Sequence, residues 1–224
     1  MVLDQVARDV MTRLKEETAE LHKEAEQRDF QRALLQGTIS RDDYIRWLGQ
    51  MRHVHGALER RLKSASKTNG AIAAVVKGYQ YSEPYLIDDL RFFGVEPESI
   101  APLAATIESV ARINDESITP AELLGRHYVL EGSKNGSRFI AAAVGKALGL
   151  SPPPRGRGMT YLDPYGAEQR PRWQQFRTDM NAAGFSPEEC EHLVLGAKDM
   201  FREIGRINDE LAPRSGGVAA LRPR

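Results

Sequence analysis

The chain has 224 residues, a length that suits one large domain. Its 31 Lys and Arg residues balance 31 Asp and Glu residues, which argues against the excess positive charge that non-specific nucleic-acid binding requires. The single cysteine, Cys190, excludes an intramolecular disulfide and any metal site built from several cysteines.

No segment has the composition of a membrane span or of a secretion signal. The most apolar run, residues 139–150, contains Lys146 and is shorter than the roughly 20 residues that a spanning helix needs. The N-terminus mixes acidic and basic side chains and lacks the apolar stretch of a signal peptide. We therefore expect a cytoplasmic monomer with no membrane or nucleic-acid partner.

Apolar residues at three- and four-residue spacing predict helices along nearly the whole chain. The predicted helices cover residues 4–26, 40–68, 71–93, 97–114, 119–150, 173–183 and 186–211, with a long loop over 155–172. Ser40, Thr119 and Ser186 can each cap a helix, because Asp or Glu follows three residues later. No segment alternates as a strand would. The sequence predicts an all-α, single-domain bundle over 1–211 and a flexible tail over 212–224.

The predicted helix that begins at Pro120 is unusually rich in glycine, and each interior glycine costs about 1 kcal/mol relative to alanine. Gly132 and Gly136 are one turn apart and are followed by Ser133 and Ser137, so one face of the helix carries almost no side chains. Such a face permits either a close crossing with a second helix or a flat, bulky ligand against the bare backbone. The spacing alone leaves both interpretations open.

His22 bears on this choice, because the pattern puts it on the apolar stripe of the first predicted helix. A lone histidine there is more often a hydrogen-bonded core residue than a ligand, yet neutral imidazole is also a common ligand of haem iron. A histidine helix on one side and a bare glycine helix on the other would suit a porphyrin held between them.

Four segments, taken in order, resemble biliverdin-producing haem oxygenases. Residues 14–26 resemble the proximal helix of that family, and residues 128–137 resemble the distal helix, with the Glu-Gly-Ser-x-x-Gly pattern of the bacterial branch. Residues 90–94 and 161–173 also match in order and spacing. The resemblance covers about residues 12–211. It implies a haem-oxygenase-like helical bundle with haem between a proximal and a kinked distal helix.

The resemblance also implies a role for each matching residue. His22 falls at the proximal iron ligand, and Gly132 and Gly136 fall at the distal glycines that face the haem. Ser133 falls beside them in the catalytic segment. The resemblance further assigns haem-binding roles to Lys15, Tyr128, Arg177 and Phe201. Lys15 and Arg177 would partner the propionates, because buried carboxylates need cationic partners.

The implied reaction is the cleavage of haem b, as substrate and cofactor together, to biliverdin, CO and ferrous iron. It needs O2 and an external reductant, supplied by an electron-donor protein such as a ferredoxin or a reductase. This chain departs from the family pattern at Ser133, where many members have Asp, and at Lys134, Asn135 and Ser137. These changes bear on the rate and on which meso carbon is attacked. His127 stands where the family often has a tyrosine near a propionate.

Two alternatives share the all-α architecture. A di-iron carboxylate protein needs two Glu-x-x-His pairs and two further carboxylates, and only Glu189 with His192 fits, at a helix start where Glu is expected as a cap. A haem-binding carrier or sensor would keep His22 and lack turnover, and the sequence leaves this alternative open.

Overall fold

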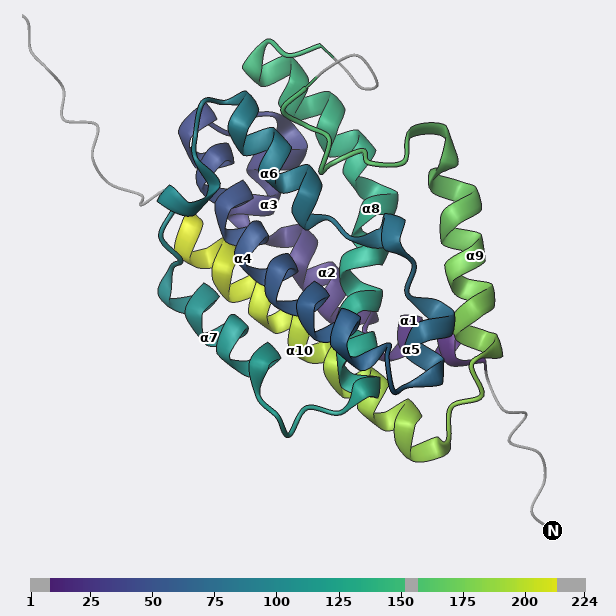
Figure 1. Ribbon diagram of the computed structural model, residues 1–224. Helices are drawn as coiled ribbons and strands as arrows, with labels where there is room; N and C mark the ends of the chain where they lie inside the picture. Colours follow the sequence, from purple (N-terminus) through teal and green to yellow (C-terminus); the bar gives the residue numbers. More distant parts are fainter. Residues whose placement is uncertain (1–8, 152–156, 213–224) are drawn as a thin grey trace, which may run out of the picture.

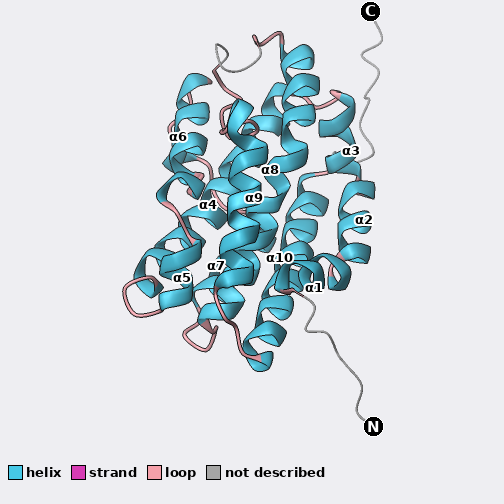
Figure 2. Ribbon diagram, turned by 90° about the vertical axis from the view of Figure 1, so that its right-hand side faces the viewer, coloured by secondary structure: helices cyan, strands magenta, loops and turns pink. Residues whose placement is uncertain are grey.

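The computed structural model describes residues 9–151 and 157–212, and every regular element in these two stretches is a helix (Figures 1 and 2). The α-helices are α1 (Val10–Glu17), α2 (Ala19–Gln27), α3 (Asp29–Gln36), α4 (Arg41–Ala65), α5 (Gly70–Val75), α6 (Glu83–Phe92), α7 (Ala104–Asn114), α8 (Pro120–Leu148), α9 (Gln169–Ala182) and α10 (Pro187–Leu211). Three 3-10 turns, η1 (Gly78–Gln80), η2 (Pro97–Ser99) and η3 (Gly166–Glu168), lie between them. The predicted all-α fold is confirmed.

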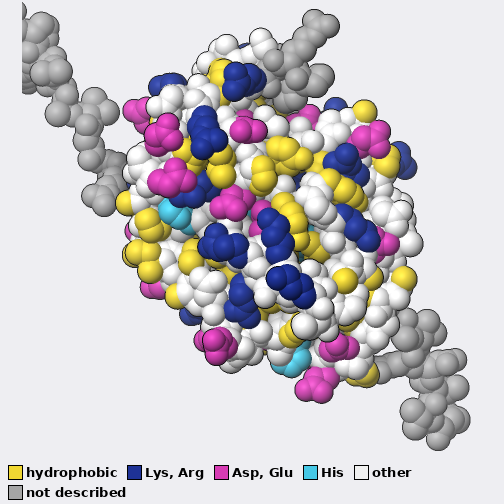
Figure 3. Space-filling view, in the orientation of Figure 1, with side chains coloured by type: hydrophobic (Ala, Val, Ile, Leu, Met, Phe, Trp, Pro, Cys, Tyr) yellow, Lys and Arg dark blue, Asp and Glu magenta, His cyan; other side chains and the backbone are white. Residues whose placement is uncertain are grey.

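The helices surround one continuous apolar core. Figure 1 shows α10 running diagonally across the molecule, with α4 and α7 beside it. Helix α9 lies at the right of this view, and α8 lies between α4 and α9. In Figure 2, α1, α2 and α3 rise one above another along one edge of the molecule, and α8 rises beside them. None of the described helices is long and apolar enough to cross a membrane. Although charge balances over the chain, Lys and Arg side chains gather over the middle of α4 in Figure 3.

Three helix starts follow from side-chain caps. The Ser40 hydroxyl accepts a backbone N–H at the start of α4, and Thr119 and Ser186 form full capping boxes with Glu122 and Glu189 at the starts of α8 and α10. Each box satisfies two backbone N–H groups that a helix N-terminus otherwise leaves without partners. The predicted starts of these helices are therefore confirmed.

The first predicted helix, over 4–26, is wrong in two respects: Asp9 is the N-cap of α1 and not a helical residue, and the helix divides at Thr18 into α1 and α2. Residues 4–8 lie outside the described residues. The Thr18 hydroxyl donates to the carbonyl of Leu14 at 2.7 Å, and its backbone N–H donates to the same oxygen at 3.1 Å. A hydroxyl that competes in this way for a carbonyl one turn back bends or ends a helix. The apolar stripe continues across the break, so periodicity alone could not reveal it.

Elsewhere the structure adds helical residues that were not predicted, and it defines the shorter helical pieces expected over 71–93 and 97–114. Helix α3 was not predicted, and α9 begins at Gln169, inside the predicted loop. The segment 71–93 contains α5, η1 and α6, and 97–114 contains η2 and α7. Apart from Ala212, the predicted tail lies outside the described residues, as do residues 155 and 156 of the predicted loop and the three prolines before them.

Glycines allow α8 and α10 to cross at close range. A Cβ atom on Gly125 would overlap the backbone carbonyl of Leu193 on α10, and a Cβ on Gly196 would overlap that of Glu122 on α8. The two helix backbones therefore touch where both lack a side chain. The sequence left a helix crossing open at Gly132 and Gly136, but the crossing lies at Gly125. At Gly136 a Cβ would have no heavy atom within 4 Å, so the crossing interpretation does not hold there.

This contrast predicts opposite effects of the same substitution at two positions on one helix. Gly125→Ala should lower the free energy of unfolding, because overpacking costs about 1–3 kcal/mol and more than offsets the gain of about 1 kcal/mol in helix propensity. Gly136→Ala should keep the gain in helix propensity, because the added methyl group meets no other atom, and so should not lower the free energy of unfolding. Melting curves without added ligand should show a Tm lowered by a few degrees for Gly125→Ala alone. Equal melting of the two variants would contradict the crossing.

Candidate functional site

The candidate site begins where α8 meets the break between α1 and α2. The Tyr128 hydroxyl, on α8, lies near the buried Thr18 side chain, and burial raises the pKa of this phenol. One helical turn beyond this contact, the chain reaches His22 on α2 and Gly132 on α8. Helices α2 and α8 therefore diverge from the place where Tyr128 lies near Thr18. Helix α2 carries the predicted iron ligand, and α8 carries the predicted glycine face.

The structure corrects the environment expected for His22. Its side chain is 61% exposed, and α2 contributes no buried residue, so His22 does not lie on a buried apolar stripe. The stripe enters the core only through α1, where Val10 and Leu14 are buried. The imidazole instead lies against the ring of Phe201 on α10 in a T-shaped arrangement, with 5.8 Å between ring centroids. Two of the predicted site residues are therefore in contact.

The glycine face of α8 is open at Gly136 and bounded by an aromatic ring at Gly132. A Cβ on Gly132 would lie 3.4 Å from the Trp173 ring, and nothing lies within 4 Å of that position at Gly136. Trp173, on α9, stacks on Phe176 and also lines a groove of about 290 Å³ between α8 and the start of α9. Trp173 was not among the predicted site residues, although it ends one of the matching segments.

The remaining predicted site residues, Arg177, Lys15 and Ser133, have exposed side chains. Arg177 on α9 is exposed and acts electrostatically on Tyr128 and on Asp9, the N-cap of α1. Lys15 is exposed in the last turn of α1. Ser133 is exposed, and its hydroxyl donates to the Leu130 carbonyl at 2.8 Å. The structure gives neither Lys15 nor Ser133 a contact with another predicted site residue.

Behind the glycine face, α8 carries a buried ion pair that the sequence analysis did not predict. The Lys134 ammonium donates to the Glu131 carboxylate at 2.7 Å, to the Gln80 carbonyl at 2.8 Å and to the Tyr165 hydroxyl at 2.9 Å. Burial lowers the pKa of Lys134, and the Glu131 carboxylate opposes this shift. All three ammonium protons are used, so Lys134 is turned away from the open face at Gly136.

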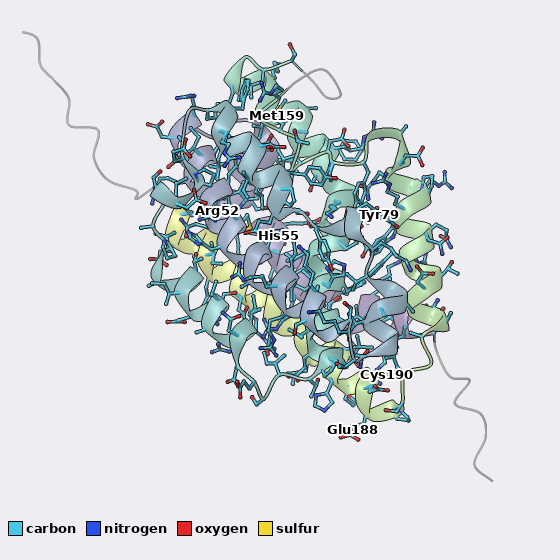
Figure 4. The ribbon with its side chains drawn as sticks, in the orientation of Figure 1. Arg52, His55, Tyr79, Met159, Glu188 and Cys190 are labelled. Carbon is cyan, nitrogen blue, oxygen red and sulfur yellow. The ribbon has the colours of Figure 1, made fainter. Side chains whose placement is uncertain are left out.

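His127 extends this buried polar region towards α4. Its Nε2 lies 3.0 Å from the Gln80 amide oxygen, which also accepts the Lys77 backbone N–H, so the imidazole donates. Figure 4 shows a second buried histidine, His55, on α4 in the middle of the fold, where it contacts the Tyr161 hydroxyl at 3.0 Å. His127 is buried rather than exposed, and burial lowers its pKa to about 3.

The sequence from residue 8 to residue 210 matches the family model described as heme oxygenase. The chain belongs to the haem oxygenase family. Family members are oxidoreductases, and the cleavage of haem to biliverdin is the family function. The match spans both walls of the candidate site, from α1 to the end of α10.

Individual relatives are distant but cover most of the chain. Heme oxygenase 1 of Homo sapiens is 25% identical over 213 residues, which cover 93% of this chain and 73% of the human protein. The heme oxygenase structure from Leptospira interrogans is 26% identical, with a TM-score of 0.80 over 90% of this chain and 99% of that one. Heme oxygenase-1 of Synechocystis, solved in complex with heme, is 21% identical with a TM-score of 0.80 over 91% of this chain and 92% of that one.

The di-iron alternative has no support among the described residues. No three His, Cys, Asp or Glu side chains within residues 9–151 and 157–212 gather as a metal-binding group. Glu189, the first residue of the single Glu-x-x-His pair, accepts the Ser186 backbone N–H at 2.8 Å. His192 lies 3.5 Å from Glu122, which belongs to the capping box of α8. These carboxylates are therefore committed to helix starts.

The buried His127 predicts an acid-sensitive step in stability. Its folded pKa of about 3 lies below the unfolded value of 6.5, so below pH 6.5 the unfolded chain binds a proton that the folded protein excludes. The free energy of unfolding therefore falls with pH by up to about 1.4 kcal/mol per unit. Urea unfolding should show that His127→Gln loses about 2 kcal/mol less than the wild type between pH 7 and pH 5. An equal loss in both would contradict the assignment.

Proposed function

We propose that this protein binds haem b between α2 and α8 and cleaves it to biliverdin, CO and ferrous iron. The reaction uses O2 and electrons from a donor protein such as a ferredoxin or a reductase, and the enzyme acts as a cytoplasmic monomer. One observation carries the proposal. The exposed imidazole of His22 and the side-chain-free face at Gly136 extend from the same Thr18–Tyr128 contact.

The residues present fit a haem group. His22 offers an imidazole on a helix that buries no side chain, and Gly136 leaves space in which a Cβ would meet nothing. Phe201 supports the imidazole edge. A haem site needs a ligand for the iron on one side of the ring, a backbone without side chains on the other side, and apolar side chains around the ring. Neutral imidazole is a common protein ligand of haem iron, so His22 would hold the iron and the bound haem would supply the reaction with O2.

Lys15, Arg177 and Tyr128 would hold the propionate side. Lys15 and Arg177 are exposed cations on α1 and α9, two helices that pack against each other. A guanidinium forms paired hydrogen bonds with a carboxylate, and an ammonium acts as a point charge. Tyr128 lies close enough to Arg177 for that charge to oppose the rise of its pKa, so both reach the same region.

When bound, haem supplies the iron that takes up O2 and the ring that is oxidised. The protein's part is to orient the ring and to hold the protons that the reaction consumes. No acidic side chain stands at Gly132, Ser133 or Gly136. Because the Ser133 hydroxyl donates to Leu130, its oxygen still accepts a hydrogen bond. It would hold an ordered water, which can relay a proton where no general acid is present.

Aerobic reduction of the haem complex tests the proposal against the carrier or sensor alternative. The purified protein is titrated with haem and then given a reductant under air, and the visible absorbance and the extracted pigment are recorded. We expect the haem band to be lost and biliverdin to form. Stable haem absorbance throughout would identify a carrier or sensor, and failure to bind haem would reject both functions.

Gly136→Ala separates catalysis from binding in the same assay. The added methyl group has space in the protein alone, so haem affinity should be near normal, but the methyl would occupy the distal side of the ring. We expect biliverdin yield in a single turnover to fall sharply. Gly149→Ala is an unsuitable control because Gly149 has a φ of +65°, so Gly70→Ala, which also has open space, is the matched variant. A normal yield for Gly136→Ala would contradict the haem-facing role.

His22→Ala tests iron ligation. The variant should still bind haem through its other contacts but lose the imidazole-ligated spectrum, and added imidazole should restore that spectrum in part, because it can enter the space that the side chain leaves. His53→Ala serves as the control, since His53 lies on α4 and contacts the Ile100 carbonyl at 2.9 Å. If His22→Ala kept the wild-type spectrum and activity, another ligand would hold the iron.

A further inference from the structure

Helix α2 makes only limited contacts with the rest of the chain. None of its residues is buried, and outside the neighbouring helices of the chain its principal contact is α10. Most helices in proteins owe their stability to packing of an apolar face. The position of α2, and with it that of His22, must therefore depend on a small number of polar and aromatic contacts.

One stripe of α10 supplies these contacts. Lys198 pairs with Glu17 at 2.7 Å, Phe201 meets His22 with 5.8 Å between ring centroids, and Asp209 pairs with Arg28. We call Lys198, Phe201, Gly205 and Asp209 the α10 stripe. Successive members are three or four residues apart, so they lie on one face of the helix. Glu17, His22 and Arg28 follow them in the same order.

Gly205 makes room for Arg28 on this stripe. A Cβ at Gly205 would lie 2.8 Å from the central carbon and from Nε of the Arg28 guanidinium. The guanidinium therefore lies directly on the backbone of α10, and its Nε is buried there. From this seat it reaches Asp209, one turn further along. The stripe thus has a shaped contact at Gly205 as well as a charge at Asp209.

Arg28 also stands at a structural boundary. It has extended backbone angles, φ −67° and ψ 143°, and separates α2 from α3. At the other end of α2, Thr18 separates α1 from α2 and is buried. Contacts with α10 therefore hold both ends of α2, through Glu17 at one end and Arg28 at the other. His22 lies between these two ends.

We propose that Arg28, seated on Gly205 and paired with Asp209, is a positioning residue that holds His22 at the haem site. The inference rests on the proposed function for the role of His22 as the iron ligand. The docking of α2 on α10 stands on contacts of the protein alone. Arg28 touches neither haem nor the reacting atoms and acts through the placement of α2.

Hydrogen exchange of the α2 amides tests the docking without haem. Arg28→Met keeps much of the side-chain length and removes the charge. We expect amides of residues 19–27 to exchange about two- to fivefold faster, as befits a partly exposed ion pair, while amides of α4 and α8 keep their rates. The difference should shrink in 1 M KCl, where the screening length is about 3 Å. Unchanged α2 rates, or equal acceleration in α4 and α8, would overturn the proposal.

Two further variants separate position from general stability. Gly205→Ala improves the helix propensity of α10 but displaces the guanidinium, so it should loosen α2 without lowering the Tm. Arg28→Glu combined with Asp209→Arg restores an opposite pair and should return the α2 exchange rates towards wild type, whereas either single change should not. Failure of the double variant to recover any protection, with its Tm unchanged, would overturn the pairing.

The haem complex supplies the readout that concerns His22. We expect Arg28→Met and Gly205→Ala to release haem to excess apomyoglobin about two- to fivefold faster and to broaden the iron–histidine band in resonance Raman spectra. The charge-reversed pair should reverse both effects. If α2 loosens but haem release and the band are unchanged, Arg28 does not position His22. If the wild type binds no haem, the proposed function fails while the exchange experiment still decides the docking.

Discussion

The close crossing of α8 and α10 is the constraint on which the rest of the structure depends. Gly125 and Gly196 bring the two backbones into contact, so the distance between these helices is fixed by main-chain atoms rather than by side chains that can change rotamer. Both walls of the candidate site are attached to this pair. The distal glycines belong to α8 itself, and α2 with His22 is docked on the far half of α10.

A crossing fixes a distance but leaves rotation about the contact open. A buried ion pair beside the crossing removes this freedom, because Arg126 of α8 donates to Glu203 of α10 at 2.7 Å and both side chains are almost completely buried. Ser109 of α7 donates to the same carboxylate oxygen at 2.7 Å. Buried pairs add little net stability, but a single geometry satisfies them. Here that geometry sets which face of α8 points towards α2.

The sequence predicted the parts of the fold that depend on local chemistry. Capping residues such as Thr119 and Ser186 determine helix starts through bonds within one turn, and these starts are confirmed. The break at Thr18 was missed because it depends on a side-chain bond that leaves the apolar spacing unchanged. Family membership followed from four short segments in order. The roles of individual residues, such as Lys15 and Ser133, stay predictions.

The glycines show why spacing alone could not assign the site. Gly125 and Gly136 look alike in the sequence, yet one lies against a carbonyl of α10 and the other lies against nothing within 4 Å. What separates them is the position of a helix more than 50 residues later in the chain. Likewise, Glu131 and Lys134 have the three-residue spacing of an ordinary surface pair, and only the tertiary structure shows that both are buried.

A helix face without side chains cannot be positioned by its own packing contacts. In α8, hydrogen bonds on the opposite face and side-chain bonds within the helix fix the position of this face. From behind, the Lys134 ammonium uses all its protons on partners away from the glycines. From within, Asn135 donates to the Gly132 carbonyl at 3.0 Å and Ser137 donates to the Ser133 carbonyl at 2.8 Å. Side-chain bonds of this kind can bend helices, and the kink of α8 stays a prediction. The departures from the family pattern at these positions therefore keep the face at Gly136 clear: each polar group is bonded to the protein itself, and none needs to turn towards a bound ring.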